Sequence, residues 1–319
     1  MAKTTYIITG PTASGKSDFA HELALRANGT IINADSVQIY RGLETLSASP
    51  LKNSPSIDNI PYKLYSIIRP PEKMSAGRYA ELAHAEAAQA DTPIFVGGTG
   101  FYLSALTDGF SDLPDVSRQS QLIAEGFANK HAELQKCDPV LAAKLHPNDT
   151  QRLTRALSIF IETGQPLSSF QQFPAKGGGV SGSAGRGGSL IKIAILPPRA
   201  ELLKRAAARR ETMLANGALD EVKMNISFDI KAIGFREIRS YLRDEISRDE
   251  MLRLWSIADA QYIKRQFTWL RNKFLAQKSP SLAKGWTAKQ DGVVVNNNSN
   301  QIIIDHIPTS KDIEDVLRK

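Results

Sequence analysis

One octapeptide near the start of the chain combines residue types that can bind phosphate: Gly10, Pro11, Thr12, Ala13, Ser14, Gly15, Lys16 and Ser17. It fits the pattern G-x-x-x-x-G-K-[ST] at every fixed position. In this pattern a glycine turn directs backbone N–H groups at phosphate oxygens, the lysine adds a positive charge, and the last hydroxyl can bind a phosphate-linked Mg²⁺. The octapeptide therefore predicts a site for a polyphosphate or a diphosphate, with Ser17 as the Mg²⁺ ligand.

Asp35 is a second candidate, because a carboxylate that follows a strand would face the bound phosphates. It would either help to hold Mg²⁺ or act as a general base, unless it only forms a turn or caps a helix. ATPases with this loop usually hold the metal with an Asp after another apolar strand. Here glycines follow Val96 and prolines follow Leu196. This argues against motor proteins and GTPases, and it leaves open a kinase that uses Asp35 as its base.

Three further groups have side chains that could contact a phosphate-bearing ligand. The glycine turn 98–100 allows close approach of a ligand to the hydroxyl of Thr99, although such turns are common. Arg152 and Arg155 are three residues apart, so they either contact phosphates or form the solvated face of a helix. Arg209 either neutralises phosphate charge or lies on the surface.

Short β-branched and aromatic segments, which predict strands, alternate with segments that have apolar residues at helical spacing. The predicted strands are 5–9, 30–34, 93–96, 191–196 and 302–304. This alternation predicts parallel βαβ units and an α/β fold with a doubly wound sheet. Ligands bind beyond the carboxyl ends of such strands. The octapeptide, Asp35 and the turn at 97–100 should therefore face one crevice.

The segment 115–189 is too long for a simple crossover between two strands. Its apolar residues recur at helical spacing until Gly164 and Pro166, which end a helix. We expect residues 1–114 and 190–319 to form a P-loop α/β core with a helix-rich C-terminal half, and residues 115–189 to form an inserted helical subdomain. The glycine-rich segment 176–188 has the composition of a flexible loop.

The chain of 319 residues has a formal net charge of +7 and a pI near 9.4. Such an excess suggests nucleic acid as a partner, or a basic surface that keeps the protein soluble. Clustering favours the first interpretation, since the basic residues gather on three predicted helices: Arg152 and Arg155; Lys204, Arg205, Arg209 and Arg210; Lys264, Arg265, Arg271 and Lys273.

Cysteine content and hydropathy suggest the compartment. Cys137 is the only cysteine, so the chain has no internal disulfide and no cysteine-based zinc site. No apolar segment approaches the length of a membrane span, and the first strand begins too early for a signal peptide. We expect a cytoplasmic protein that is not bound to a membrane.

The segment 261–271 predicts a helix that is apolar on one side and basic on the others. Ile263, Phe267, Leu270 and Phe274 recur at helical spacing and should be core. Basic residues and Trp269 fall on the other faces, as in surfaces that bind a nucleic-acid backbone and stack on bases.

Eight segments, taken together and in order, resemble the bacterial tRNA dimethylallyltransferases, also called tRNA isopentenyltransferases. The segments are GPTASGKS (10–17), NADSVQIYRGL (33–43), GGTGFY (97–102), NDTQRLTRAL (148–157), GQPLS (164–168), ARRETMLANG (208–217), KAIGFRE (231–237) and QYIKRQFTWLR (261–271). The first is shared with many proteins, whereas the combination with the second, third and last is more specific. Two departures are PYKL at 61–64, where the family has PHHL, and Ser158, where it has a glutamate.

The resemblance implies transfer of a dimethylallyl group from dimethylallyl diphosphate to N6 of the adenosine on the 3′ side of the anticodon in tRNA, with release of diphosphate. The octapeptide would then bind the diphosphate rather than ATP, with Mg²⁺ at Ser17. Asp35 would be the general base, Thr99 would position the substrates, and Arg209 would contact the diphosphate. N6 of adenine is a poor nucleophile, so a base close to it and neutralised diphosphate charge would lower the barrier. The adenine would also have to leave its stack to enter the crevice.

The resemblance also implies which residues touch the tRNA anticodon stem-loop, some of them in the insertion. They are Asp35, Ser36, Val37, Gln38, Thr99, Gln151, Arg152, Leu153, Thr154, Arg155, Lys231, Ala232, Ile233, Gly234, Phe235 and Arg236. A monomer suffices for this chemistry.

Two other functions remain open on the sequence alone. A small-metabolite or nucleotide kinase would use the octapeptide and Asp35, but it does not explain the basic C-terminal helices. A non-catalytic RNA-binding protein would use the basic helices and keep the octapeptide only as structure.

Overall fold

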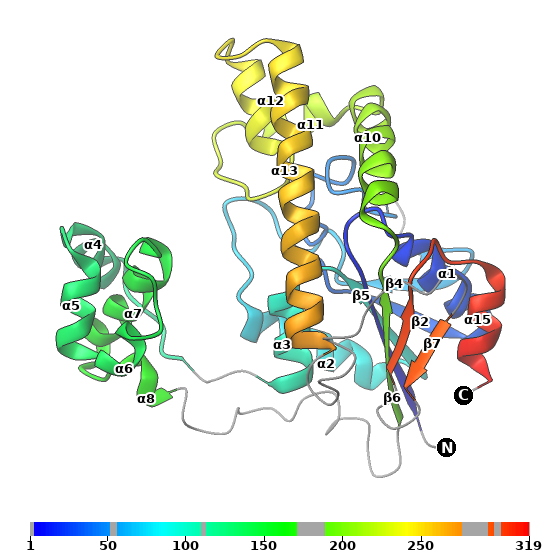
Figure 1. The fold of residues 1–319 in the computed structure, drawn as a ribbon, viewed down its shortest axis with the longest axis horizontal. Helices are drawn as coiled ribbons and strands as arrows, with labels where there is room; N and C mark the ends of the chain where they lie inside the picture. Colours follow the sequence, from blue (N-terminus) through cyan, green and yellow to red (C-terminus); the bar gives the residue numbers. More distant parts are fainter. Residues whose placement is uncertain are drawn as a thin grey trace. The chain divides into compact units, whose positions relative to one another are not determined.

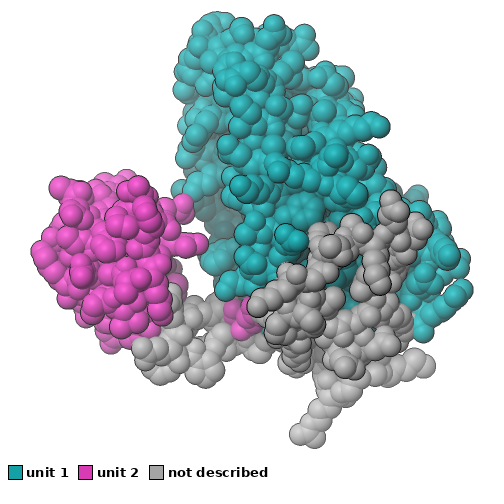
Figure 2. Space-filling view, in the orientation of Figure 1, with its two compact units in different colours: residues 1–107, 179–319 teal, residues 108–178 magenta. Residues whose placement is uncertain are grey.

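The computed structural model describes residues 3–51, 56–109, 113–170, 189–275, 293–296 and 301–318. The chain forms two compact units, of which the first comprises residues 1–107 and 179–319 and the second residues 108–178 (Figures 1 and 2). The glycine-rich segment 176–188, predicted to be a loop, lies outside the described residues.

The first unit is built on a sheet of eight described strands in the order β3-β4-β2-β5-β1-β6-β8-β7. The strands are β1 Thr4–Thr9, β2 Gly29–Asn33, β3 Ser56–Ile57, β4 Ile60–Lys63, β5 Thr92–Gly97, β6 Ser189–Ile195, β7 Val293–Asn296 and β8 Gln301–Ile304. Neighbours from β4 to β8 pair in parallel, and β3 and β7 are antiparallel edge strands. The predicted doubly wound parallel sheet is confirmed.

The central strands are buried on both faces, as parallel strands covered by helices must be. In β1, Ile7 and Ile8 are both completely buried, although they point to opposite faces. Helices α1 (Lys16–Ala27) and α15 (Ser310–Leu317) cover one face, and α2 (Ala76–Gln89) and α3 (Gly100–Asp108) cover the other (Figure 1). β1 thus lies in the middle of the sheet, and the loop that follows it is held by rigid elements.

The C-terminal half of the first unit is helical, as expected. Its helices are α10 Arg199–Ala215, α11 Ala218–Met224, α12 Phe235–Leu242 and α13 Arg248–Trp269, which continues as the π-helix η1 Leu270–Phe274. They pack around an apolar cluster that includes Met213, Phe235, Met251 and Trp255. None of the helices in the described ranges is long and apolar enough to cross a membrane.

The second unit contains only helices among its described residues: α4 Arg118–Gly126, α5 Lys130–Cys137, α6 Pro139–Ala142, α7 Thr150–Thr163 and α8 Leu167–Phe170. Their core is apolar, and α7 supplies its centre with Leu153, Ala156 and Leu157. α7 ends where predicted, because Gly164 adopts the left-handed conformation with φ 70°.

Two features of the first unit were not predicted. β4 lies beside β2, but it is only four residues long and contains Pro61, so no strand pattern is visible in it. Phe267 is only half-buried, whereas the polar Gln266 beside it is 6% exposed. The prediction of Phe267 as core is therefore wrong, and the buried face of α13 contains an amide instead.

Candidate active site

The loop between β1 and α1 has the backbone shape of an anion site. Ala13 and Gly15 have positive φ angles of 65° and 85°, so successive backbone N–H groups turn inward. No side chain caps the N-terminus of α1, whose first N–H groups have no partner within the helix. The buried hydroxyl of Ser14 also has no hydrogen-bond partner among the described residues. All of these donors suit phosphate oxygens.

Basic side chains from α10 lie over this loop. Arg205 Nε donates to the carbonyl oxygen of Ala13 at 2.9 Å, and Arg209 Nη2 donates to Thr12 Oγ1. Together with Lys16 and Ser17, these arginines line a cavity of about 410 Å³, which we call the phosphate cavity. Arg209 therefore does not lie free on the surface, and it reaches the loop from a helix that begins almost two hundred residues later in the chain.

The ammonium group of Lys16 has a lowered pKa in the phosphate cavity. Burial lowers the pKa of its ammonium from 10.5 to about 8, Asp35 opposes this shift, and Arg209 adds to it. Lys16 is therefore fully charged only well below pH 8, and its charge is lost as the pH rises through that value. Burial likewise lowers the pKa of Arg209, although a guanidinium keeps its proton in proteins.

We expect diphosphate binding to weaken above pH 8, because the unliganded protein then loses the Lys16 proton. The dissociation constant should rise about tenfold for each pH unit above that value, as the competent fraction falls. Calorimetric titration with diphosphate between pH 7 and 9.5 measures this. Lys16→Arg keeps a positive charge over this pH range and serves as the control. Diphosphate itself titrates equally in both experiments, so its effect cancels in the ratio of the wild-type to the variant dissociation constant. A ratio that does not change with pH would contradict the prediction.

Asp35 and Thr99 come together at the carboxyl ends of β2 and β5. Asp35 Oδ1 accepts a hydrogen bond from the Val37 N–H at 2.9 Å, so the carboxylate also forms a turn. Thr99 Oγ1 accepts from the Ser36 N–H at 2.9 Å and contacts the Ser36 hydroxyl at 3.2 Å. Only one oxygen of Asp35 is engaged in this turn, and the carboxylate lines a cavity.

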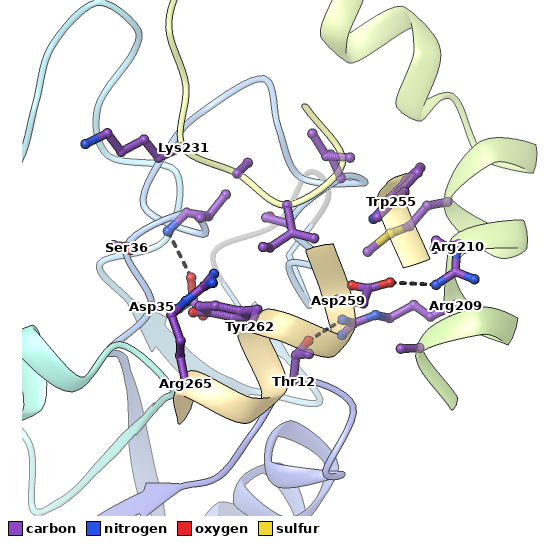
Figure 3. A pocket seen from close by; sticks show the side chains of 17 residues that line it. Thr12, Asp35, Ser36, Arg209, Arg210, Lys231, Trp255, Asp259, Tyr262 and Arg265 are labelled. Carbon is purple, nitrogen blue, oxygen red and sulfur yellow. Dashed lines mark hydrogen bonds and ion pairs between the residues drawn. The ribbon is translucent and has the colours of Figure 1, made fainter. Parts of the chain in front are cut away.

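This second cavity, the central cavity, has a volume of about 180 Å³ and collects groups from distant parts of the chain (Figure 3). Thr12 and Arg209 lie on one side of it and Asp35 and Tyr262 on another, while Arg210 and Asp259 form an ion pair of 2.7 Å between α10 and α13 (Figure 3). Arg209 and the neighbouring residues Thr12 and Ala13 join it to the phosphate cavity. Acidic and basic groups thus face the same small space.

Among the residues expected to touch tRNA, several line the central cavity: Asp35, Ser36, Val37, Lys231, Ala232 and Ile233. Other residues of this set form hydrogen bonds within the protein, are buried in its core or begin a helix. The Gln38 amide donates to the carbonyl oxygens of Ser47 and Ala48 at 3.1 and 3.0 Å, and Phe235 is 1% exposed. Gly234 begins α12 with φ 88°, and Arg236 is exposed.

In the second unit, Gln151, Arg152 and Arg155 are exposed on α7, with Thr154 half-buried. Arg152 pairs with Asp149, the N-cap residue of the helix, at 3.5 Å. Leu153 is 1% exposed and belongs to the core of this unit, so its side chain is not available to a ligand.

Two site residues on α13 were not singled out from the sequence. Gln266 Oε1 accepts from the Thr12 N–H at 2.9 Å, and Gln266 Nε2 donates to the Gly98 carbonyl oxygen at 3.2 Å. Tyr262 lines the central cavity and forms a side-chain hydrogen bond with Thr99, and burial raises the pKa of its phenol. Trp269, expected at the surface, is half-buried against Gly100. A polar residue at a core position of the helical repeat was the only sequence signal for Gln266.

The side chains at the site also show which of them could bind a metal ion. No group of three or more His, Cys, Asp or Glu side chains that could hold a metal occurs within the described ranges. Mg²⁺ needs few protein ligands where it also binds phosphate oxygens, and it keeps several waters. The Ser17 hydroxyl, beside Lys16 in the phosphate cavity, fits that kind of site.

Comparisons with known proteins agree on one family. The family profile described as IPP transferase matches residues 38–273, and the profile described as isopentenyl transferase matches residues 3–57. A tRNA dimethylallyltransferase of Rhizobium johnstonii is 39% identical over 291 residues, which cover 84% of this chain and 93% of that protein.

Solved structures are similar over most of the chain. A eukaryotic dimethylallyltransferase described as acting on tRNA has a TM-score of 0.70 at 25% identity, covering 85% of this chain and 71% of the other. A full-length tRNA isopentenylpyrophosphate transferase from Bacillus halodurans has a TM-score of 0.62 at 28% identity, covering 99% and 95%.

Proposed function

This chain belongs to the IPP transferase family, and from that premise we infer that it is a prenyltransferase that transfers a dimethylallyl group to tRNA. The acceptor is N6 of the adenosine on the 3′ side of the anticodon, as the sequence resemblance implied. The kinase alternative is not favoured, since the related proteins named above are all transferases of this kind.

We propose dimethylallyl diphosphate as the donor. The N6 lone pair attacks C1 of the dimethylallyl group, and the bond from C1 to the diphosphate oxygen breaks. The diphosphate leaves with the electron pair of that bond. N6 loses one proton, which a base must accept. Two demands follow for the protein, namely stabilisation of charge on the leaving group and a base near N6.

The first demand is met by the loop that carries Lys16 and by the arginines of α10. Lys16 and Arg209 line the phosphate cavity, where their charges would neutralise the departing diphosphate. When bound, Mg²⁺ would add further positive charge, held by the Ser17 hydroxyl and phosphate oxygens. The buried hydroxyl of Ser14 would donate to a phosphate oxygen, which gives it the partner that it lacks within the described chain.

The second demand is met by Asp35. Its carboxylate lines the central cavity, and one carboxylate oxygen, Oδ1, is held by the Val37 N–H. Thr99 fixes the neighbouring Ser36 backbone, so it positions this base and the substrates beside it. The adenine would enter from the side that is lined by residues 231–233.

The observation that supports this function best is the shared cavity, in which Thr12 and Arg209 lie across from Asp35. A donor held at the phosphate loop and a base that accepts the N6 proton would therefore be close together. One copy of the chain supplies all of these groups, so we propose that a monomer is active. We also propose that it acts in the cytoplasm, because its substrate is tRNA.

The test is incubation of the purified protein with Mg²⁺, labelled dimethylallyl diphosphate and unmodified tRNA, followed by mass spectrometry of the tRNA nucleosides. We expect labelled N6-dimethylallyladenosine at the position after the anticodon. A parallel incubation with γ-labelled ATP tests the kinase. Transfer of that phosphate to a small molecule, with tRNA unlabelled, would overturn the assignment, and so would tRNA binding without any transfer.

We expect Arg152→Ala to weaken tRNA binding and to reduce its salt dependence, because the exposed guanidinium would neutralise one phosphate. The slope of log K against log salt should decrease in magnitude by up to about one. Filter binding at several salt concentrations measures both quantities. Arg118→Ala is the matched control, since Arg118 is exposed in the same unit and pairs with Glu125. Equal slopes for wild type and Arg152→Ala would contradict the prediction.

A further inference from the structure

Helix α13 presents a row of side chains to three parts of the candidate site: α10, the phosphate loop and the turn 98–100. The row lies on one face, because its members are three, four and three residues apart: Asp259, Tyr262, Gln266 and Trp269. Their partners are, in the same order, Arg210 on α10, Thr99, the pair Thr12 and Gly98, and Gly100. Within this row, Gln266 forms hydrogen bonds with two loops of the site at the same time, at Thr12 and at Gly98.

The two hydrogen bonds of Gln266 require an amide of this length. Thr12 offers an N–H and Gly98 offers a carbonyl oxygen, so the partner must accept from one loop and donate to the other. Glutamine does this with a single planar group, whereas an ionised carboxylate only accepts and an apolar side chain does neither. The side chain is 6% exposed, so water cannot easily replace either bond.

Gly98 is adapted to this approach. A Cβ atom on residue 98 would overlap Gln266 Nε2, so a larger residue would push the amide away from the loop. The glycine turn after β5 thus serves contact with α13 as well as contact with a ligand.

Each loop held by Gln266 carries a group assigned to the reaction. Thr12, on one side, also accepts the hydrogen bond from Arg209, which lies over the phosphate cavity. Next to Gly98 on the other side is Thr99, which holds the Ser36 backbone beside Asp35. Gln266 therefore binds Thr12, which contacts Arg209 of the phosphate cavity, and it binds Gly98, the chain neighbour of Thr99.

We propose that Gln266 is a positioning residue that sets the separation between the leaving-group site and the general base. The proposal rests on the function proposed above. Binding of each substrate depends mainly on its own loop, whereas the transfer step depends on the distance between the two loops. Loss of Gln266 should therefore reduce the rate of transfer more than it reduces binding, because small displacements of reacting groups are costly.

The first test is Gln266→Met, which keeps the length of the side chain and removes both hydrogen bonds. Single-turnover transfer at saturating donor and tRNA should fall by about 10- to 100-fold, with the tRNA dissociation constant unchanged. The control is Met251→Ala on the same helix, because Met251 is 1% exposed and contacts neither loop. Rates are compared at equal intervals below each melting temperature. If both variants lose activity in the same proportion, Gln266 only contributes stability and the proposal is overturned.

The second test is Gln266→Glu, which also serves if the methionine variant does not fold. An ionised glutamate would still accept from Thr12 but would face the Gly98 carbonyl oxygen, whereas a protonated one restores the missing donor. The ratio of its transfer rate to that of wild type should rise as the pH falls from 8 to 6. A ratio independent of pH would overturn the proposal. Wild-type protein without any transfer would instead overturn the proposed function, so the two failures are distinguishable.

Discussion

Asp35→Asn should lower the single-turnover rate of dimethylallyl transfer by about 100- to 10,000-fold, the range of general-base contributions. Asparagine keeps the Oδ1 acceptor for the Val37 N–H, so the turn should survive, while the replacement removes the base. The tRNA should bind as well as before, because the lost group acts on one proton. Rapid-quench measurement with labelled donor gives the rate, and filter binding gives the affinity.

Two variants make this result specific. Asp35→Ala removes the turn acceptor as well, so any excess loss over Asp35→Asn measures the structural role of the carboxylate. Asp91→Asn is the matched control, because Asp91 is an exposed carboxylate just before β5, at the end of the strand away from the site. Full activity of Asp35→Asn would show that another group accepts the N6 proton, and the mechanism proposed here would be wrong.

Arg209→Ala should reduce kcat/KM for the donor by about 100- to 1,000-fold, because it removes a half-buried positive charge that would neutralise the leaving group. The same change removes the donor to Thr12 Oγ1, which loosens the phosphate loop. Arg209→Lys keeps a charge but has no planar fork, so it should recover only part of the loss. Steady-state kinetics with varied dimethylallyl diphosphate and product inhibition by diphosphate measure the effect.

Lys204→Ala is the control for net charge, since Lys204 is exposed on the same helix. It should leave the kinetic constants for the donor unchanged. If Arg209→Ala kept wild-type inhibition by diphosphate, Arg209 would not contact the leaving group. An equal effect of both variants would point to long-range attraction instead, which added salt would screen.

The fold could be predicted to a large extent, because its signals are local. The strands around the phosphate loop are continuous apolar segments, and Gly164 ends α7 where the pattern changes. β4 could not be predicted, since it is short, contains proline and is a strand only because β2 pairs with it. Likewise, the burial of Gln266 in place of Phe267 depends on what α13 packs against, and helical spacing does not contain that information.

The candidate site divides in the same way. The phosphate loop and Ser17, the proposed Mg²⁺ ligand, are formed by residues close together in the chain, so their pattern can be recognised in the sequence. Asp35 and Arg209 were expected from the sequence, but their place in one cavity and the contact of Arg209 with Thr12 result from tertiary packing. The roles of Tyr262 and Gln266 arise from loops that are more than 150 residues away in the chain.

The amino-acid sequence by itself determined the class of sheet, the phosphate loop and, through several motifs in order, the family. These features have local signals, such as turn residues, runs of strand-forming residues and helical periodicity, which residue types encode directly. Only the tertiary structure decided which side chains share the central cavity and which amide joins the two loops. Such contacts depend on the complementary packing of elements that are distant in the chain. A shift of one helix would change the partners of each of its side chains.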